Sequence, residues 1–328
     1  WPAQTVEKVW LIGGLYYGSL SGLNEATPSN TIYTSETGDN FNWVETVGAL
    51  PNNFSCTALY ADNFIYEHGF PENKVNALML VTGGTKTGGT NIESEELHSV
   101  YINVTSSPSL WLRFKFDNVQ KFDGTTWRYF RPLRSPMVCF HNGAVYIAGG
   151  SQSSYGQGWI KNIWRWNGNY KYNEITEEYT IDNDCMDYMG QLPSSPESIY
   201  AYGNMVSFEG DLYITNALTF VMDPDWRPIP SNNLFRSEDN GVTWSVVTSN
   251  FSSTIGRRFD PHAIVYDDKI IVSFGIDYDD VDPDPNYPPG TNYAKPENCN
   301  KNAYYSHVVS RDDLGKITEI EWRDFSTI

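Results

Sequence analysis

The sequence predicts an all-β fold that is built from a repeated antiparallel unit and forms a single domain over residues 1–328. A short apolar strand followed by Gly-Gly occurs three times, beginning at Val9, Leu78 and Ala144. Two degenerate copies begin at Asp211 and Ile270, so successive copies start roughly 60 to 70 residues apart. Because the repeat runs through the whole of the 328-residue chain, it favours one domain over two.

The third copy sets the expected pattern of the unit. We expect its first strand at 135–140, and a turn at Asn142-Gly143 leads into a second strand at 144–147. The third strand is expected at 162–166 and the fourth at 172–176. Strands joined in this order form a four-stranded antiparallel meander.

This pattern resembles the kelch repeat of β-propellers, in which an apolar strand, Gly-Gly, a long connection and an aromatic-rich strand precede an outer strand. The resemblance implies a single β-propeller of four-stranded antiparallel blades. Strand-like segments at 110–116 and 119–122 indicate a degenerate sixth blade, so six blades are preferred and five are the alternative. Either the stretch at 5–8 or the C-terminal strand at 319–325 would complete a blade across the ring and remove exposed sheet edges.

A second signature marks the turns before the outer strands. The segment Ser237-Glu238-Asp239-Asn240-Gly241-Val242-Thr243-Trp244 is similar to the Asp-box of sialidase-type propellers, with looser versions at 35–43, 123–127 and 310–315. In such a turn the Asp carboxylate accepts backbone N–H groups, Gly provides a positive φ, and Trp packs between sheets. We therefore assign these turns a role in folding and no further function.

The expected loops differ in length between the two faces of the fold. In an antiparallel meander, the loops between second and third strands leave on the same face as the connections between blades. The loops on this face are long, at 15–30, 85–96, 151–161, 218–233 and 276–302, whereas the opposite turns are short. Long loops on a rigid scaffold commonly carry function, so we expect the ligand on the long-loop face.

Aromatic and basic side chains from these loops are the candidate ligand-binding residues. They are Tyr16, Tyr17, Tyr155, Trp159, Trp226 and Arg257. Aromatic rings beside acidic groups suit a sugar ring, by apolar stacking, or a cationic ligand, by cation–π attraction. The alternative is that these rings pack the loops against one another.

The most enzyme-like cluster is Arg257-Arg258-Phe259-Asp260-Pro261-His262. If the protein is an enzyme, the candidate catalytic residues are His262, His307, Arg258 and Asp260, which would hold an anionic substrate and transfer a proton. The alternative is a salt-bridged connection with a structural histidine. The chain contains neither H-E-x-x-H nor a Walker A loop, and it lacks the N-terminal arginine segment of sialidases.

An acidic stretch at 277–284 suggests a metal site. Asp280, Asp282 and Asp284 are candidate calcium ligands because Ca²⁺ prefers carboxylate oxygens. The stretch is not an EF-hand, since Pro285 occupies the position of the required Gly. The alternative is a solvated acidic loop, and no other cofactor is expected.

Charge and sequence motifs bear on the partners and the compartment. A net charge of −18 would repel the phosphate backbone of a nucleic acid, and no apolar run is long enough for a membrane span. N-glycosylation sequons begin at Asn53, Asn103 and Asn250, and Trp1 as first residue is typical of a chain that has lost a signal peptide. We therefore expect a secreted, extracellular glycoprotein.

The four cysteines are Cys56, Cys139, Cys185 and Cys299, and they are widely spaced. Secretion would favour two disulfides, whereas buried free thiols are the alternative, and the spacing leaves both open.

Together these observations predict a secreted protein whose long-loop face binds a glycan, an extracellular protein or a small-molecule ligand. Two alternatives remain open. One is a secreted enzyme that acts on a small organic or sugar substrate at a central pocket, and the other is a matrix protein that assembles through calcium.

Overall fold

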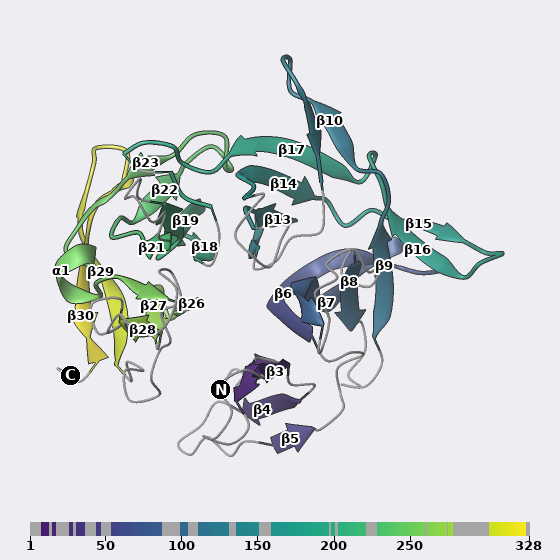
Figure 1. Ribbon diagram of the computed structural model, residues 1–328, viewed down its shortest axis with the longest axis horizontal. Coiled ribbons are helices and arrows are strands. Elements are labelled where there is room, and N and C mark those ends of the chain that lie inside the picture. The colour runs from purple at the N-terminus through teal and green to yellow at the C-terminus, as the bar shows by residue number, and fades with distance from the viewer. Residues whose placement is uncertain are drawn as a thin grey trace, which may run out of the picture.

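Figure 1 shows the computed structural model of the protein. It describes residues 8–12, 15–17, 26–28, 31–36, 44–46, 54–86, 99–103, 111–130, 136–150, 159–196, 198–200, 203–220, 228–259, 261–273, 275–277 and 302–325. These ranges are almost entirely β, apart from the single helical turn α1 (Phe251–Thr254). The predicted all-β fold is confirmed. No helix in these ranges has the length and apolar composition needed to cross a lipid bilayer.

Five sheets of three or more strands form the body of the described chain, and an antiparallel meander of three or four strands is the centre of each. The first sheet contains β1 (Lys8–Ile12), β4 (Ile32–Glu36) and β5 (Val44–Thr46). The second contains β6 (Phe54–Glu67), β7 (Phe70–Lys86), β8 (Ser99–Asn103) and β9 (Leu112–Phe116). The third contains β12 (Met137–His141), β13 (Ala144–Ala148), β14 (Asn162–Trp166) and β17 (Met186–Gln191).

The last two sheets follow the same order. The fourth contains β18 (Asn204–Phe208), β19 (Asp211–Thr215), β22 (Phe235–Ser237) and β23 (Ser245–Val246). The fifth contains β26 (His262–Tyr266), β27 (Lys269–Ser273), β29 (Ala303–Arg311) and β30 (Ile317–Asp324), with β24 (Thr248–Ser249) at its outer edge. Each of the five repeat copies therefore lies in a strand of a different sheet.

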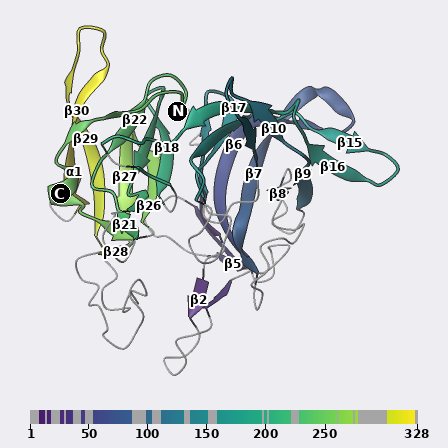
Figure 2. The ribbon, with the colours of Figure 1, turned by 45° about the horizontal axis from the view of Figure 1, so that its top comes forward.

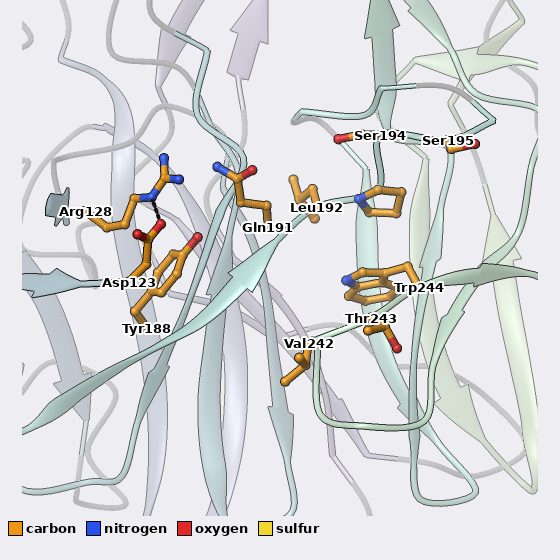
Figure 3. A pocket seen from close by; sticks show the side chains of 11 residues that line it. Asp123, Arg128, Tyr188, Gln191, Leu192, Ser194, Ser195, Val242, Thr243 and Trp244 are labelled. Atoms are coloured by element: carbon orange, nitrogen blue, oxygen red, sulfur yellow. Dashed lines mark hydrogen bonds and ion pairs between the residues drawn. The ribbon is translucent and has the colours of Figure 1, made fainter. Parts of the chain in front are cut away.

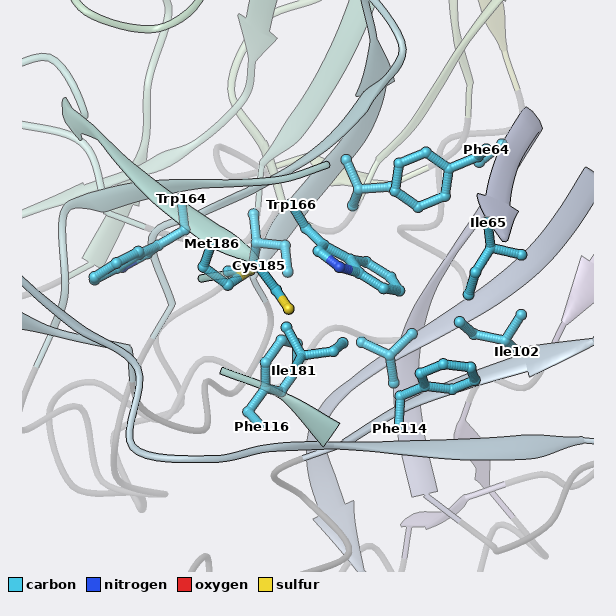
Figure 4. Packing of buried hydrophobic residues seen from close by; sticks show 14 of the residues in the cluster. Phe64, Ile65, Ile102, Phe114, Phe116, Trp164, Trp166, Ile181, Cys185 and Met186 are labelled. Atoms are coloured by element: carbon cyan, nitrogen blue, oxygen red, sulfur yellow. The ribbon is translucent and has the colours of Figure 1, made fainter. Parts of the chain in front are cut away.

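The sheets pack side by side through apolar cores. The strands β6, β12, β18 and β26 begin successive sheets, and each contacts the next in the series. Figure 1 shows β6, β18 and β26 on the inner side of the sheets, and β9, β23 and β30 on the outer side. One core, shown in Figure 4, joins the second and third sheets around Phe64, Phe114 and Trp166, all of which are buried. Two further cores join the third sheet to the fourth and the fourth to the fifth.

The turn expected between the first two strands of the third sheet is present. Asn142 and Gly143 both have positive φ, +47° and +73°, as a tight hairpin turn requires. His141 and Ala144 are paired on either side of this turn.

The outer strand of the third sheet differs from the expectation. β17 takes this position, whereas 171–181 forms a hairpin of β15 (Lys171–Asn173) and β16 (Glu178–Ile181). β16 runs parallel to β9 and extends the second sheet instead, with Tyr179 opposite Phe114. The prediction of a fourth strand at 172–176 is therefore wrong, because this segment lies in the hairpin that pairs with the second sheet.

The segments expected to form a sixth blade are used elsewhere. β9 is the fourth strand of the second sheet, and β10 (Gln120–Phe122) pairs with β11 (Trp127–Tyr129) in a separate hairpin. The C-terminal strand is also accounted for, because β30 pairs with β29 in its own sheet. Within the described residues the count of larger sheets is therefore five, and 319–325 does not complete the first sheet. The stretch at 5–7 lies outside the described residues.

The long connections contain short ladders of their own. β2 (Leu15–Tyr17) pairs with β3 (Ala26–Pro28), β20 (Leu218–Phe220) pairs with β21 (Pro228–Pro230), and β25 (Arg258–Phe259) pairs with β28 (Ile276–Asp277). Figure 2 shows β2 and β28 on one side of the sheets and the tip of the β29–β30 hairpin on the other. The described strands β2 and β28 thus lie on the opposite side of the sheets from the β29–β30 hairpin.

Two of the four cysteines are free thiols. Cys139 and Cys185 are both buried and unpaired, so the chain does not form two disulfides. Burial raises the pKa of the Cys139 thiol to about 12, which keeps this sulfur protonated and unreactive at neutral pH. The side chain of Cys56 and the whole of Cys299 lie outside the described residues.

Candidate functional site

An open groove runs along the outer edge of the third sheet (Figure 3). Its volume is about 510 Å³, within the range typical of small-ligand sites. One wall comes from the β10–β11 hairpin, the floor from β17 and the segment after it, and the other wall from the turn between β22 and β23. The lining residues are Asp123, Arg128, Tyr188, Gln191, Leu192, Pro193, Ser194, Ser195, Val242, Thr243 and Trp244.

The first wall is held in place by the carboxylate of Asp123. Its Oδ1 accepts the backbone N–H groups of Thr126 at 2.8 Å and Thr125 at 2.9 Å, and its Oδ2 accepts Nε of Arg128 at 2.7 Å. These hydrogen bonds, the Thr126 one foremost, hold the pKa of Asp123 well below its usual range. Asp123 is therefore a permanent acceptor, and within the described residues it bonds Nε of Arg128 rather than either terminal nitrogen.

The second wall is a turn organised by Asp239. Its Oδ1 accepts the backbone N–H of Thr243 at 2.8 Å, and its Oδ2 accepts the Thr243 hydroxyl at 2.6 Å. Gly241, with φ +88°, donates its N–H to Ser237 Oγ at 2.8 Å. The turn presents Thr243 and Trp244 to the groove.

Trp244 packs against the core between the third and fourth sheets and also lines the groove. Its indole Nε1 is buried and has no hydrogen-bond partner among the residues that the structure describes. The floor residue Tyr188 is half-buried, with the guanidinium of Arg128 5.9 Å from its ring centroid. The ring centroid of Trp164 lies 5.5 Å from that of Tyr188 in an edge-to-face arrangement. Both aromatic rings are thus fixed in place by packing.

The groove reaches the long-loop face at Ser194, where a second group of side chains begins. Lys161 precedes β14 at the end of the 151–161 loop, and its Nζ donates to Ser194 Oγ at 3.0 Å and to Ser198 Oγ at 2.9 Å. The same ammonium lies 4.8 Å from the ring centroid of Tyr200. Burial lowers the pKa of Lys161.

The Gly-Gly motif of the third repeat explains how Tyr200 comes to lie there. Gly150 N–H donates to the Tyr200 carbonyl at 2.9 Å. A Cβ on Gly149 would lie 1.8 Å from that carbonyl oxygen, and φ of Gly149 is +67°. Only glycine allows the segment that connects the third and fourth sheets to pass so close to the end of β13.

Of the predicted ligand-binding residues, Trp159 lies beside this cluster, with its ring centroid 6.3 Å from that of Tyr200. Tyr16 and Tyr17 form part of β2 and are paired with Thr27 and Ala26. Arg257 is half-buried just before β25. Tyr155 and Trp226 lie outside the described residues.

The predicted catalytic cluster is not assembled in the described part of the chain. His262 is exposed and paired with Ser273, which in turn is opposite Ala303, whereas His307 lies four residues further along β29. Arg258 is buried, donates to the carbonyl of Ile255 at 2.8 Å and lies over the ring of Tyr304 at 4.8 Å. The strand register places the two histidines apart, and the side chain of Arg258 is used in packing within the fold. Asp260 lies outside the described residues.

The predicted calcium and glycosylation sites lie only partly within the residues that the structure describes. Asp280, Asp282, Asp284 and Asn53 lie outside the described residues, and elsewhere no group of three or more His, Cys, Asp or Glu side chains is suited to a metal ion. Asn103 is 6% exposed at the end of β8. Asn250 donates to the Trp322 carbonyl at 3.1 Å and accepts the Trp322 N–H at 2.6 Å. Asn103 is therefore buried and Asn250 is hydrogen-bonded to β30, and glycosylation at either position stays a prediction.

Comparisons with known proteins bear on the fold alone. No family model matches the chain, and no curated protein matches it. The solved structure of YjhT is similar over 96% of this chain and 81% of that chain, with a TM-score of 0.50 and 9% sequence identity. The likeness extends over nearly all of the sheets described above.

Proposed function

We propose that the protein is a carbohydrate-binding β-propeller with five kelch-like blades, and that the groove beside β17 holds the sugar. The observation that carries the proposal is the groove itself, which combines the rings of Tyr188 and Trp244 with closely spaced hydrogen-bonding side chains. Secretion remains part of the proposal, although neither Asn103 nor Asn250 supports it.

The chemistry of the groove suits a polyol. A sugar presents hydroxyl groups that both donate and accept, and apolar C–H faces that pack on aromatic rings. Asp123 and the Ser194 and Thr243 hydroxyls can accept, while Arg128 and Gln191 can donate. The carboxylate and guanidinium are already paired with each other, so the site suits an uncharged sugar ring at this end.

The proposed propeller rests on the order of the sheets. Five meanders follow one another along the chain, and the first strands of four of them lie in sequence on the inner side. Closure between the fifth sheet and the first would complete a ring without exposed inner edges.

The enzyme alternative has less support, because its candidate residues are dispersed. His262 and His307 lie at different levels of the fifth sheet, and Arg258 is packed into the fold. The calcium alternative rests on residues outside the described part of the chain.

The test is a glycan array probed with the purified protein and three variants. Wild type should bind a defined set of glycans. Tyr188→Ala should weaken binding at least about ten-fold, equivalent to about 1.4 kcal/mol, because it removes a packed aromatic surface. Gln191→Ala, at an exposed position, should weaken it without affecting folding.

Tyr60→Ala is the matched control, since Tyr60 is 57% exposed on β6. Circular dichroism would check that each variant is folded. A blank array for the folded wild type, or equal binding by the Tyr188→Ala and Tyr60→Ala variants, would refute the proposal.

A further inference from the structure

Among the residues that the structure describes, Lys161 is a cation that contacts no carboxylate, although the protein is strongly acidic. The chain has a net charge of −18, with 40 acidic and 22 basic residues. Yet among the residues that the structure describes, Lys161 contacts two serine hydroxyls and one aromatic ring, and no carboxylate. By contrast Lys171, Lys269 and Lys316 are each ion-paired.

The position of Lys161 is enclosed, so the missing counter-charge has an energetic cost. The ammonium is part-buried between Ser198 and Tyr200, and burial is what lowers its pKa. A partly buried charge without a partner is unfavourable, and an anion placed beside it would offset that cost.

The two hydroxyl groups beside the ammonium can also donate to an anion. Ser194 and Ser198 accept from Nζ, so each hydroxyl proton points elsewhere and is available for donation to the same acceptor group. Ser194 also lines the groove and is exposed, which connects this cluster to solvent and to the proposed ligand.

We propose that Lys161, Ser194 and Ser198 bind a carboxylate group of the ligand. One ammonium and two hydroxyls match the single charge and two oxygens of a carboxylate. A phosphate would carry nearly two charges and would require a second cation, but the charge of the Arg128 guanidinium is already balanced by Asp123. This inference rests on the proposed function, because it assigns a charged substituent to the ligand of the same groove.

The experiment uses acetate as the probe, so that it does not depend on any sugar. Lysine reactivity would be measured on the intact protein by reductive methylation with trace formaldehyde, followed by peptide mass spectrometry. Acetate, neutral acetamide and inorganic phosphate would be compared at equal ionic strength, adjusted with sodium chloride. Lys269, ion-paired with Asp267 in the turn between β26 and β27, is the internal control.

Acetate should slow the modification of Lys161 about three-fold or more, the effect of occupying two-thirds of the sites, and should leave Lys269 unchanged. Acetamide, which has the same shape without the charge, should not protect. In the double variant Ser194→Ala with Ser198→Ala, acetate should no longer slow the modification of Lys161. This rate can still be measured because the variant keeps the lysine.

Three results would overturn the proposal: no protection by acetate, equal protection by acetamide, or stronger protection by phosphate than by acetate. Glycan binding that depends on Tyr188, together with no acetate protection, would remove this inference and leave the proposed function standing. Acetate protection together with a blank glycan array would refute the proposed function and would leave the carboxylate site standing.

Discussion

At the scale of single residues, the clearest case is a buried histidine between two sheets. His141 is 2% exposed, and its Nδ1 lies 2.8 Å from Ser207 Oγ while its Nε2 lies 3.1 Å from Asn240 Oδ1. Burial lowers the pKa of His141 below its ordinary value of 6.5, and the Asn240 hydrogen bond and Asp211 oppose this only in part. The ring is therefore neutral in the folded protein at neutral pH.

A pH dependence of stability follows from this shift. As the pH falls below about 6.5, the unfolded chain takes up a proton at His141 before the folded chain does, so the free energy of unfolding decreases. We expect the loss to reach at most about 1.4 kcal/mol per pH unit for this one group. The measurement is urea unfolding across this pH range for wild type and for His141→Gln.

His141→Gln should be less stable at neutral pH and should show a smaller decrease on acidification than wild type. An unchanged pH dependence in His141→Gln would contradict the assignment of the lowered pKa to this residue.

The residue scale also shows where sequence reasoning missed the groove. Asp123, Thr243 and Trp244 were recognisable in the sequence, but as parts of turns with a role in folding alone. The structure shows that a turn side chain can form the turn and also line the groove. Trp127 differs from the expectation in another way: it is 56% exposed, because its hairpin stands apart from the cores.

Tyr188 and Lys161 had no sequence signal of comparable strength. Tyr188 stands in a strand that was not expected, and Lys161 is one lysine at the end of a long loop. Lys161 contacts Ser198, and Tyr188 contacts Arg128. These pairs come from segments that are brought together only when the sheets pair. Single-sequence patterns do not contain such contacts.

At the scale of elements, the Gly-Gly motif gives a prediction that compares two glycines. Gly149→Ala would place a methyl group 1.8 Å from the Tyr200 carbonyl oxygen at a positive φ, so the strand end and the connection must separate. Gly210→Ala also has a positive φ, +85°, but meets nothing within 4 Å. We expect about 1 kcal/mol of destabilisation at Gly210 and at least about 3 kcal/mol at Gly149.

Urea unfolding of the two variants would measure the difference. Equal losses would show that the close approach of Tyr200 to β13 does not matter for stability. A larger loss at Gly149 would support close backbone packing as the physical reason for the Gly-Gly repeat.

The repeated strands were predictable because each contains a short apolar run, and Gly-Gly follows three of the five. The outer strands were not, since 171–181 and 186–191 are both strand-like and only tertiary pairing decides between them. β17 takes the outer position with Met186 fully buried, whereas β16 pairs with β9. Tertiary pairing also places β9 in the second sheet, so this segment does not form the sixth blade that was expected.

At the scale of the whole molecule, the sheets are joined by apolar cores and by a few ionic contacts. Arg236 is 6% exposed, pairs with Asp211 at 2.6 Å and donates to the carbonyl of Ile317, which belongs to the fifth sheet. Arg311 in turn forms two hydrogen bonds with Glu209 of the fourth sheet, at 2.6 and 2.7 Å. These contacts join the fourth sheet to the fifth.

The groove belongs to this scale because no single sheet forms it. Its walls come from a separate hairpin and from the fourth sheet, and its floor comes from the third. The fold could be predicted from the repeats as all-β, but the groove depends on how neighbouring units pack.

The most direct test of carbohydrate binding is a crystal structure of the protein with a glycan selected on the array. We expect electron density for a sugar in the groove, in contact with Tyr188 and Trp244. A well-defined sugar bound elsewhere on the protein, with the groove containing only solvent, would contradict the account.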